Sequence, residues 1–171
     1  AGFATIDLTI LHQATLFIMM IFMFVGASPA STGGGVKTTT IAVLILTVKS
    51  FLLGKEDIEV FGRRITSSTV RKSVGIFFVG VLAVLTGILL IVLIEPEFDL
   101  LEASFEVVSA LATVGLSIGG SSNLTSIGKL LIVIYMFMGR VGLLTIFLAL
   151  VAKNTVNKQQ IRYPEGRIIV G

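Results

Sequence analysis

One short segment has the composition of a backbone that can bind a dehydrated cation: Thr113 to Ser117, which reads TVGLS. Cation filters use rings of backbone carbonyls to replace the ion's water shell, and glycine permits the φ and ψ angles this requires. The preceding residues 100–111, LLEASFEVVSAL, have apolar residues at helical spacing but are too few to cross a bilayer. The C-terminal end of such a half-helix would direct its partial negative charge at the segment. The pattern predicts a pore-loop filter, and the alternative is an ordinary turn between membrane helices.

A second segment combines glycines, a proline and small polar residues within an otherwise apolar region. It consists of Gly26, Ala27, Ser28, Pro29, Ala30, Ser31, Thr32, Gly33, Gly34, Gly35, Val36 and Lys37. Non-helical backbone at membrane depth is tolerated only where it is buried in protein or lines a water-filled cavity. We therefore interpret the segment as a flexible intramembrane loop with a functional role. The alternative is a helix break without consequence.

The end of this loop superficially resembles a nucleotide-binding loop. The Walker A motif requires G-x-x-x-x-G-K-[ST] after a strand. Here Val36 separates Gly35 from Lys37, and the preceding residues do not have a strand pattern. We therefore predict that this chain alone binds no nucleotide.

A single charge, Arg140, interrupts the apolar stretch from Leu130 to Ala152. A charge at mid-membrane is costly and usually faces the protein interior or a cavity. We expect Arg140 to meet the carbonyls and hydroxyls of the glycine-rich loop or to act as a positive barrier in an ion path. A structural tie between helices is the alternative.

The elements that carry these residues belong to a membrane protein. Hydrophobic residues make up 54% of the 171 residues and charged residues 13%, against roughly 25% charged in a typical soluble domain. Residues 73–94 contain no charge and, at about 1.5 Å per residue, are long enough to cross a bilayer core. The sequence shows no paired carboxylates, no nucleophile–base set and no metal-binding cluster. We therefore do not expect an enzyme. The net charge of +3 is explained by membrane topology and does not indicate nucleic acid.

Charge placement gives the expected orientation. Cytoplasmic loops carry the excess of Lys and Arg. Residues 54–72 and the tail after 152 are rich in Lys and Arg, whereas residues 95–123 have five acids and neither Lys nor Arg. We therefore expect a multi-pass protein of the cell membrane with 54–72 and the tail in the cytosol and 95–123 outside.

An internal repeat supports a two-unit arrangement. Residues 134–139, IYMFMG, resemble residues 21–26, IFMFVG. Gly139 follows Gly115 by 24 residues, and Gly26 follows Gly2 by the same number. Residues 1–3 therefore take the place of residues 114–116, and such repeats are common in membrane transport folds.

At this point the chain resembles a known family. Residues 1–3 look like the end of a T-A-G-F filter. Residues 26–40 and 113–117 are similar to motifs of the KtrB membrane subunits of Ktr potassium transporters, in the Trk/Ktr/HKT superfamily, and residues 138–142 are similar to their last pore helix. The resemblance extends over essentially the whole chain.

The resemblance implies an architecture and partners. It implies four helix–pore loop–helix repeats around one pore, of which residues 1–54 end the third repeat and residues 73–152 form the fourth. Residues 55–72 would be a cytosolic linker and residues 153–171 a cytosolic C-terminal tail. The implied partners are a second copy in a homodimer, a KtrA-like cytosolic nucleotide-binding regulatory ring, a missing N-terminal half of the same subunit, and membrane lipid.

Our expectations are thus an all-α membrane fold with re-entrant half-helices and a function in potassium transport. The candidate filter residues, whose carbonyls would bind the transported K⁺, are Ala1, Gly2, Phe3, Thr113, Val114, Gly115, Leu116 and Ser117. The candidate gate is residues 26–37, which the resemblance places below the filter, together with Arg140. The alternatives are a noncatalytic membrane scaffold, a phosphate-handling membrane enzyme, and a sodium-conducting member of the same superfamily.

Overall fold

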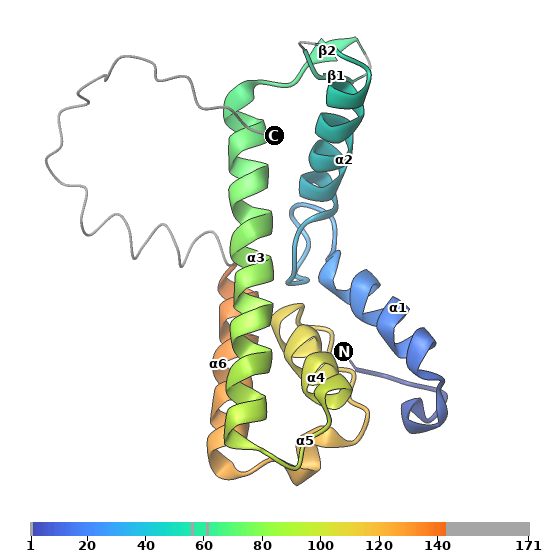
Figure 1. The fold of residues 1–171 in the computed structure, drawn as a ribbon, viewed down its shortest axis with the longest axis vertical. Helices are drawn as coiled ribbons and strands as arrows, with labels where there is room; N and C mark the ends of the chain where they lie inside the picture. The colour runs from blue at the N-terminus through green and yellow to red at the C-terminus, as the bar shows by residue number, and fades with distance from the viewer. Residues whose placement is uncertain (1, 56, 61, 143–171) are drawn as a thin grey trace, which may run out of the picture.

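The computed structural model describes residues 2–55, 57–60 and 62–142, and its described part is helical apart from one short hairpin (Figure 1). The elements are η1 (Leu8–Ile10), α1 (Gln13–Phe24), α2 (Thr38–Leu52), β1 (Glu59–Val60), β2 (Arg63–Arg64), α3 (Ser67–Ile94), α4 (Leu100–Leu111), α5 (Gly120–Asn123) and α6 (Ser126–Val141). The predicted end of the last span, residues 143–152, and the predicted tail, residues 153–171, lie outside the described residues.

Helix α3 is long and apolar enough to cross a membrane. It has 28 residues, which corresponds to about 42 Å at the α-helical rise. It begins at Ser67, six residues before the predicted span, because Thr66 takes the extended backbone of an N-cap and nothing in SSTVRK breaks a helix. Residues 67–72 at the end of the predicted linker, including Arg71 and Lys72, are therefore helical and continuous with the span.

Small residues on α3 let its neighbours approach. Gly80 and Gly87, seven residues apart, are both buried. A Cβ at Gly87 would lie 2.6 Å from Cγ1 of Val107 on α4 and 2.8 Å from the ring of Tyr135 on α6. Thr86 of α3 and Tyr135 also join their hydroxyls at 3.2 Å. Close contact through small residues is the usual way membrane helices pack.

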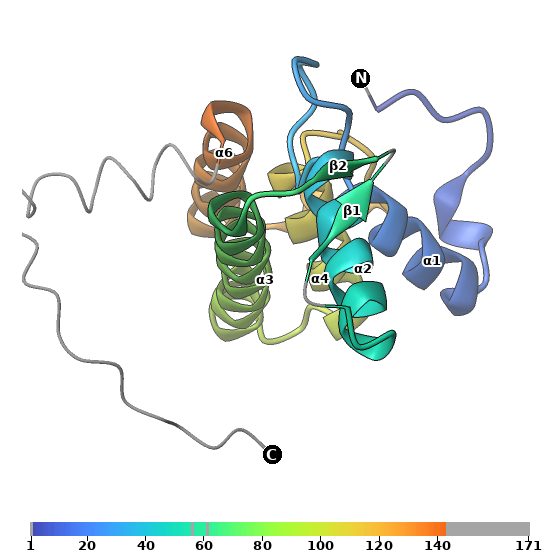
Figure 2. The same cartoon turned by 90° about the horizontal axis from the view of Figure 1, so that it is seen from above.

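Helix α4 is the centre of the fold. It has the bounds predicted for the half-helix, and it packs against α1, α3 and α6 (Figures 1 and 2). One core cluster joins its Val107 and Leu111 to Ile91 of α3, and a second joins its Phe105 and Val108 to α1. Because α4 is enclosed on several sides, its polar side chains are buried with its apolar ones.

The predicted broken helix is also present. Helices α1 and α2 are separated by residues 25–37, which turn back toward α4 (Figure 1). Beyond α2, the hairpin pairs Glu59 with Arg64 and Val60 with Arg63.

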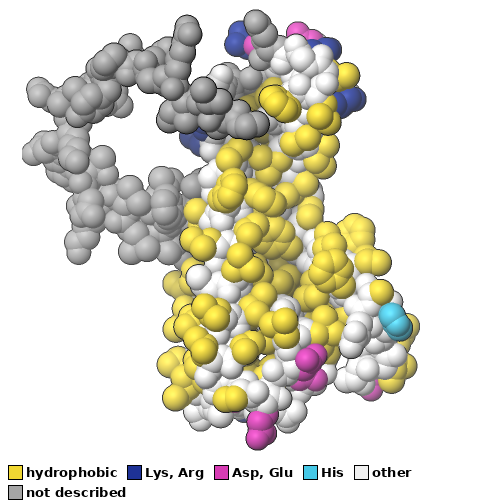
Figure 3. Space-filling view, in the orientation of Figure 1, with side chains coloured by type: hydrophobic (Ala, Val, Ile, Leu, Met, Phe, Trp, Pro, Cys, Tyr) yellow, Lys and Arg dark blue, Asp and Glu magenta, His cyan; other side chains and the backbone are white. Residues whose placement is uncertain are grey.

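The surface carries the expected polarity. Hydrophobic side chains extend over the length of the helices, and Lys and Arg gather at the end that carries the hairpin (Figure 3). Large apolar side chains such as Phe22, Leu85 and Phe137 are more than half exposed. A water-facing protein rarely exposes so continuous an apolar surface, so this one suits contact with lipid or with further protein.

Candidate functional site

The backbone after α4 takes a conformation that few residues adopt. Thr113 has a φ of 56° and Gly115 a φ of 82°. Glycine accepts this region readily, whereas for a β-branched residue it is an outlier. The turn is fixed by the amides of Thr113 and Val114, which donate to the carbonyls of Ala110 and Ser109 at 3.1 and 3.0 Å. The predicted filter segment therefore has a defined, non-helical backbone directly at the C-terminal end of a half-helix.

The start of the chain lies against this segment. Gly2 has a φ of 69°, and a Cβ added to it would lie 2.2 Å from the carbonyl oxygen of Gly115. The two glycines that the repeat matched are thus in backbone contact. Ala1 lies outside the described residues, and the side chain of Phe3 is 94% exposed.

The glycine-rich loop is closed at its base. The amide of Val36 donates to the carbonyl of Phe24 at 3.0 Å, and the amide of Gly26 donates to the carbonyl of Val36 at 2.8 Å. A Cβ at Gly26 would come within 2.0 Å of the carbonyl oxygen of Gly34, so glycine is required for this approach. Val36 is fully buried, while residues 28–32 are exposed. The loop therefore has an anchored base and an exposed tip.

The loop touches the predicted filter. The amide of Gly34 donates to Oγ1 of Thr113 at 2.7 Å. Gly34 is buried against the C-terminal end of α4, where its Cβ would lie 2.8 Å from the carbonyl oxygen of Leu111. A movement of the loop would break a hydrogen bond to the strained Thr113.

Two cationic side chains hold three successive loop carbonyls. Arg140 Nη1 donates to the carbonyl of Thr32 at 2.7 Å, which is the contact expected from the sequence. Lys37 Nζ donates to the carbonyl of Gly33 at 2.5 Å and to that of Ser31 at 3.4 Å. Sequence reasoning did not assign this second contact. Both positive charges therefore stand next to the loop tip.

Two further polar residues lie behind the filter segment, and the sequence analysis did not single them out. Glu106 and Ser109 of α4 are 5% and 3% exposed, and both hydrogen-bond to residues 116–121. The available signal was the spacing of Glu102, Glu106 and Ser109, which at i, i+4 and i+7 share one side of the helix.

Two polar residues near the N-terminus, His12 and Asp7, have local roles. Nδ1 of His12 accepts from the amide of Ala14 at 3.2 Å and caps α1. Asp7 accepts from the amide and hydroxyl of Thr9, and these hydrogen bonds lower the pKa of its carboxyl. Within the described residues, no group of three His, Asp or Glu side chains could hold a metal ion.

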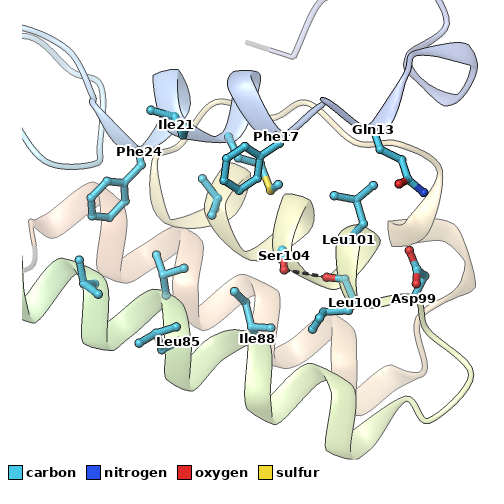
Figure 4. A pocket seen from close by; sticks show the side chains of 14 residues that line it. Gln13, Phe17, Ile21, Phe24, Leu85, Ile88, Asp99, Leu100, Leu101 and Ser104 are labelled. Carbon is cyan, nitrogen blue, oxygen red and sulfur yellow. Dashed lines mark hydrogen bonds between the residues drawn. The ribbon is translucent and has the colours of Figure 1, made fainter. Parts of the chain in front are cut away.

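An apolar groove opens between α1, α3 and α4 (Figure 4). Its volume is about 600 Å³, and Phe17, Ile21, Leu85 and Ile88 are among its lining residues. The hydroxyl of Ser104 within it donates to the carbonyl of Leu100 in the same helix at 2.6 Å. Its lining is mainly apolar, and its polar side chains are those of Gln13, Asp99 and Ser104.

The chain is similar to known cation transport proteins. A family model described as "TrkH: Cation transport protein" matches residues 1–159. The Ktr system potassium uptake protein D of Bacillus subtilis (strain 168) is 42% identical over 170 residues, which cover 99% of this chain and 37% of that protein.

Two further relatives are similar over the whole chain. The potassium/sodium uptake protein NtpJ of Enterococcus hirae is 36% identical over 100% of this chain and 39% of that protein. The Ktr system potassium uptake protein B of Vibrio alginolyticus is 37% identical over 100% of this chain and 37% of that protein. The chain thus spans well under half the length of these curated relatives.

Proposed function

This chain belongs to the TrkH family of cation transport proteins, a family of membrane transporters rather than enzymes, and from that premise we propose that it forms part of a potassium-conducting pore. The observation that carries the proposal is the backbone contact between Gly2 and Gly115, both at positive φ. Two such segments side by side supply carbonyls that can replace the water of a cation. The partial negative end of α4 favours a positive ion at the same place.

The gate of this pore is the loop of residues 26–37. Its anchored base lies under Thr113, and its exposed tip is held by Arg140 and Lys37. With these contacts formed, the tip and two positive charges obstruct an ion leaving the filter. Release of the tip removes the obstruction without unfolding the base, so the switch needs only a small shift in the loop's equilibrium.

The orientation follows the charge distribution. The hairpin end is cytosolic, and the connection between α3 and α4 is outside. An ion passes first through residues 113–117 and then past the loop, driven inward by its electrochemical gradient. The proposed partners are a second copy of the subunit, the remaining repeats of the same subunit, membrane lipid, and a cytosolic nucleotide-binding ring of KtrA-like subunits, since two relatives are described as parts of Ktr systems.

A second candidate function is conduction of sodium. One relative is described as a potassium/sodium uptake protein, and this chain is 36% identical to it. The candidate filter geometry is compatible with either ion, so selectivity has to be measured.

The test is ion flux through the full-length protein reconstituted in liposomes. Potassium uptake that exceeds sodium uptake supports the proposal, and equal or greater sodium uptake supports the second candidate. A correctly inserted protein that conducts neither ion would contradict the pore and favour a noncatalytic membrane scaffold.

A further inference from the structure

Glu106 is a buried carboxyl group without a role in the function proposed so far. It lies in the middle of α4 and is 5% exposed. A buried carboxyl is expensive unless its oxygens are hydrogen-bonded. Its partners therefore indicate what it does.

Both carboxyl oxygens accept hydrogen bonds from the chain that follows the filter. The hydroxyl of Ser117 donates to Oε1, and the hydroxyl of Ser121 donates to Oε2 at 3.1 Å. The two hydroxyls lie 2.8 Å apart, and Ser117 Oγ also accepts from the amide of Gly119 at 3.2 Å. Residues 117–121 are thus gathered around one side chain of α4.

The packing between Gly120 and the side chain of Glu106 is tight. A Cβ at Gly120 would lie 3.3 Å from Cγ of Glu106 and 2.6 Å from the ring of Phe98. The chain after the filter is therefore pressed against Glu106 as well as hydrogen-bonded to it.

Ser109 provides a second hydrogen bond to this segment from the same face of α4. It follows Glu106 by three residues, which places the two about 60° apart around the helix. Its hydroxyl donates to the carbonyl of Leu116 at 2.6 Å. The carbonyl of Leu116 is therefore directed toward α4, and Leu116 and Ser117 form the back of the segment, while Gly115 is exposed.

We propose that Glu106 is a positioning residue that fixes the filter backbone from behind and thereby sets its ion selectivity. This inference rests on the proposed function. Glu106 touches no ion in this account. It holds Ser117, Ser109 holds Leu116, and together they fix where the carbonyls of residues 113–115 stand relative to those of Gly2. Loss of either hydrogen-bonded contact lets the filter backbone relax. A filter whose carbonyls have relaxed then discriminates poorly between cations of different size.

The test measures the permeability ratio of potassium to sodium in the full-length protein, from reversal potentials in bilayers. A purely structural role would lower the amount of folded protein without changing this ratio. Glu106→Ala removes the shared acceptor of two half-buried hydroxyls, and we expect it to lower the ratio roughly fivefold or more. Glu106→Gln keeps one acceptor oxygen and an amide that can pair with the second hydroxyl, so it should retain most of the ratio.

Serine variants give a matched comparison in the same helix. Ser109→Ala removes the tie to Leu116 and should lower the ratio, while Ser104→Ala removes only a bond to Leu100 and should not. Ser117→Ala combined with Glu106→Ala should be less than additive, because both remove one shared interaction.

The outcomes separate the two claims. If the wild-type protein conducts no cation, the proposed function fails. If it conducts selectively and both Glu106→Ala and Ser109→Ala keep the wild-type ratio, the pore stands and the inference about Glu106 is wrong.

Discussion

At the scale of single residues, the account depends on backbone positions that suit few side chains. Thr113 and Gly115 both have positive φ, in a stretch where a buried hydroxyl and a buried carboxyl hold the chain in place. Strained conformations persist only where the surroundings over-determine them, and they gather at functional sites. The strain of Thr113 is compensated in part by the hydrogen bond from Gly34.

The first prediction concerns Gly115→Ser. A side chain in the left-handed region costs about 1–2 kcal/mol, so the backbone will shift away from φ 82°. We expect the potassium preference of the full-length protein to fall about fivefold, measured as competition between potassium and sodium uptake. Gly75→Ala is the control, because a Cβ at Gly75 meets no atom within 4 Å. An unchanged preference would remove residues 113–117 from the filter.

Individual residues were predictable to different degrees. Arg140 was assigned to the loop because a lone charge in an apolar helix needs a polar partner, and the repeat gave its depth. Glu106 was missed because helical spacing shows that a face exists but does not show what covers it. Only the folded chain reveals that residues 117–121 return to that face.

At the scale of elements, the broken helix is the feature with functional consequences. Helices α1 and α2 are regular, and the loop between them is hydrogen-bonded at its base and exposed at its tip. The bounds of α4 followed from its apolar spacing and its acidic and glycine-rich surroundings. The start of α3 could not be predicted in the same way. The charges of Arg71 and Lys72 suggest a loop, although they are compatible with a helix.

The second prediction concerns the gate. Arg140→Ala removes a charge-assisted hydrogen bond to Thr32 and should raise ion flux about tenfold. Deletion of Gly33 to Gly35 removes the carbonyl that Lys37 holds and the amide bound to Thr113, and should also raise flux.

The two changes together should be less than additive, since they release the same loop. The measurement is flux in liposomes, with Lys129→Ala at the other end of α6 as the control. Wild-type flux in either variant, with normal insertion, would show that the loop is not the gate or that Arg140 does not hold it.

At the scale of the whole molecule, the apolar surface and the separation of charges describe a chain placed across a membrane. One helix of the described part is long and apolar enough to span it by itself. The proposed further repeats and partners could not be placed from this sequence, because the chain spans well under half of its curated relatives.

The third prediction tests the orientation. The chain contains no cysteine, so single cysteines introduced into a cysteine-free full-length protein can be labelled selectively. Glu97 and Glu59 are both exposed, at opposite ends of the molecule. In intact cells, Glu97→Cys should react with a membrane-impermeant maleimide, and Glu59→Cys should react only after permeabilisation. The reverse labelling pattern would show that the chain has the opposite orientation in the membrane.

The fourth prediction concerns nucleotide control. Nζ of Lys37 is held by carbonyls of its own loop, and the motif spacing does not fit a phosphate-binding loop. The isolated membrane subunit should therefore not bind labelled ATP, whereas a complex with its regulatory subunit should. ATP binding by the isolated subunit that disappears in Lys37→Ala would contradict this.

The most direct test of the central claim is to locate the ion. Crystals of the full-length protein grown in Tl⁺, a potassium surrogate with strong anomalous scattering, should show an anomalous peak within coordination distance of the carbonyls of residues 113–115. The peak should weaken in Gly115→Ser. Tl⁺ flux through the same protein, with no peak at these carbonyls and ordered Tl⁺ elsewhere along the pore, would contradict the proposed filter.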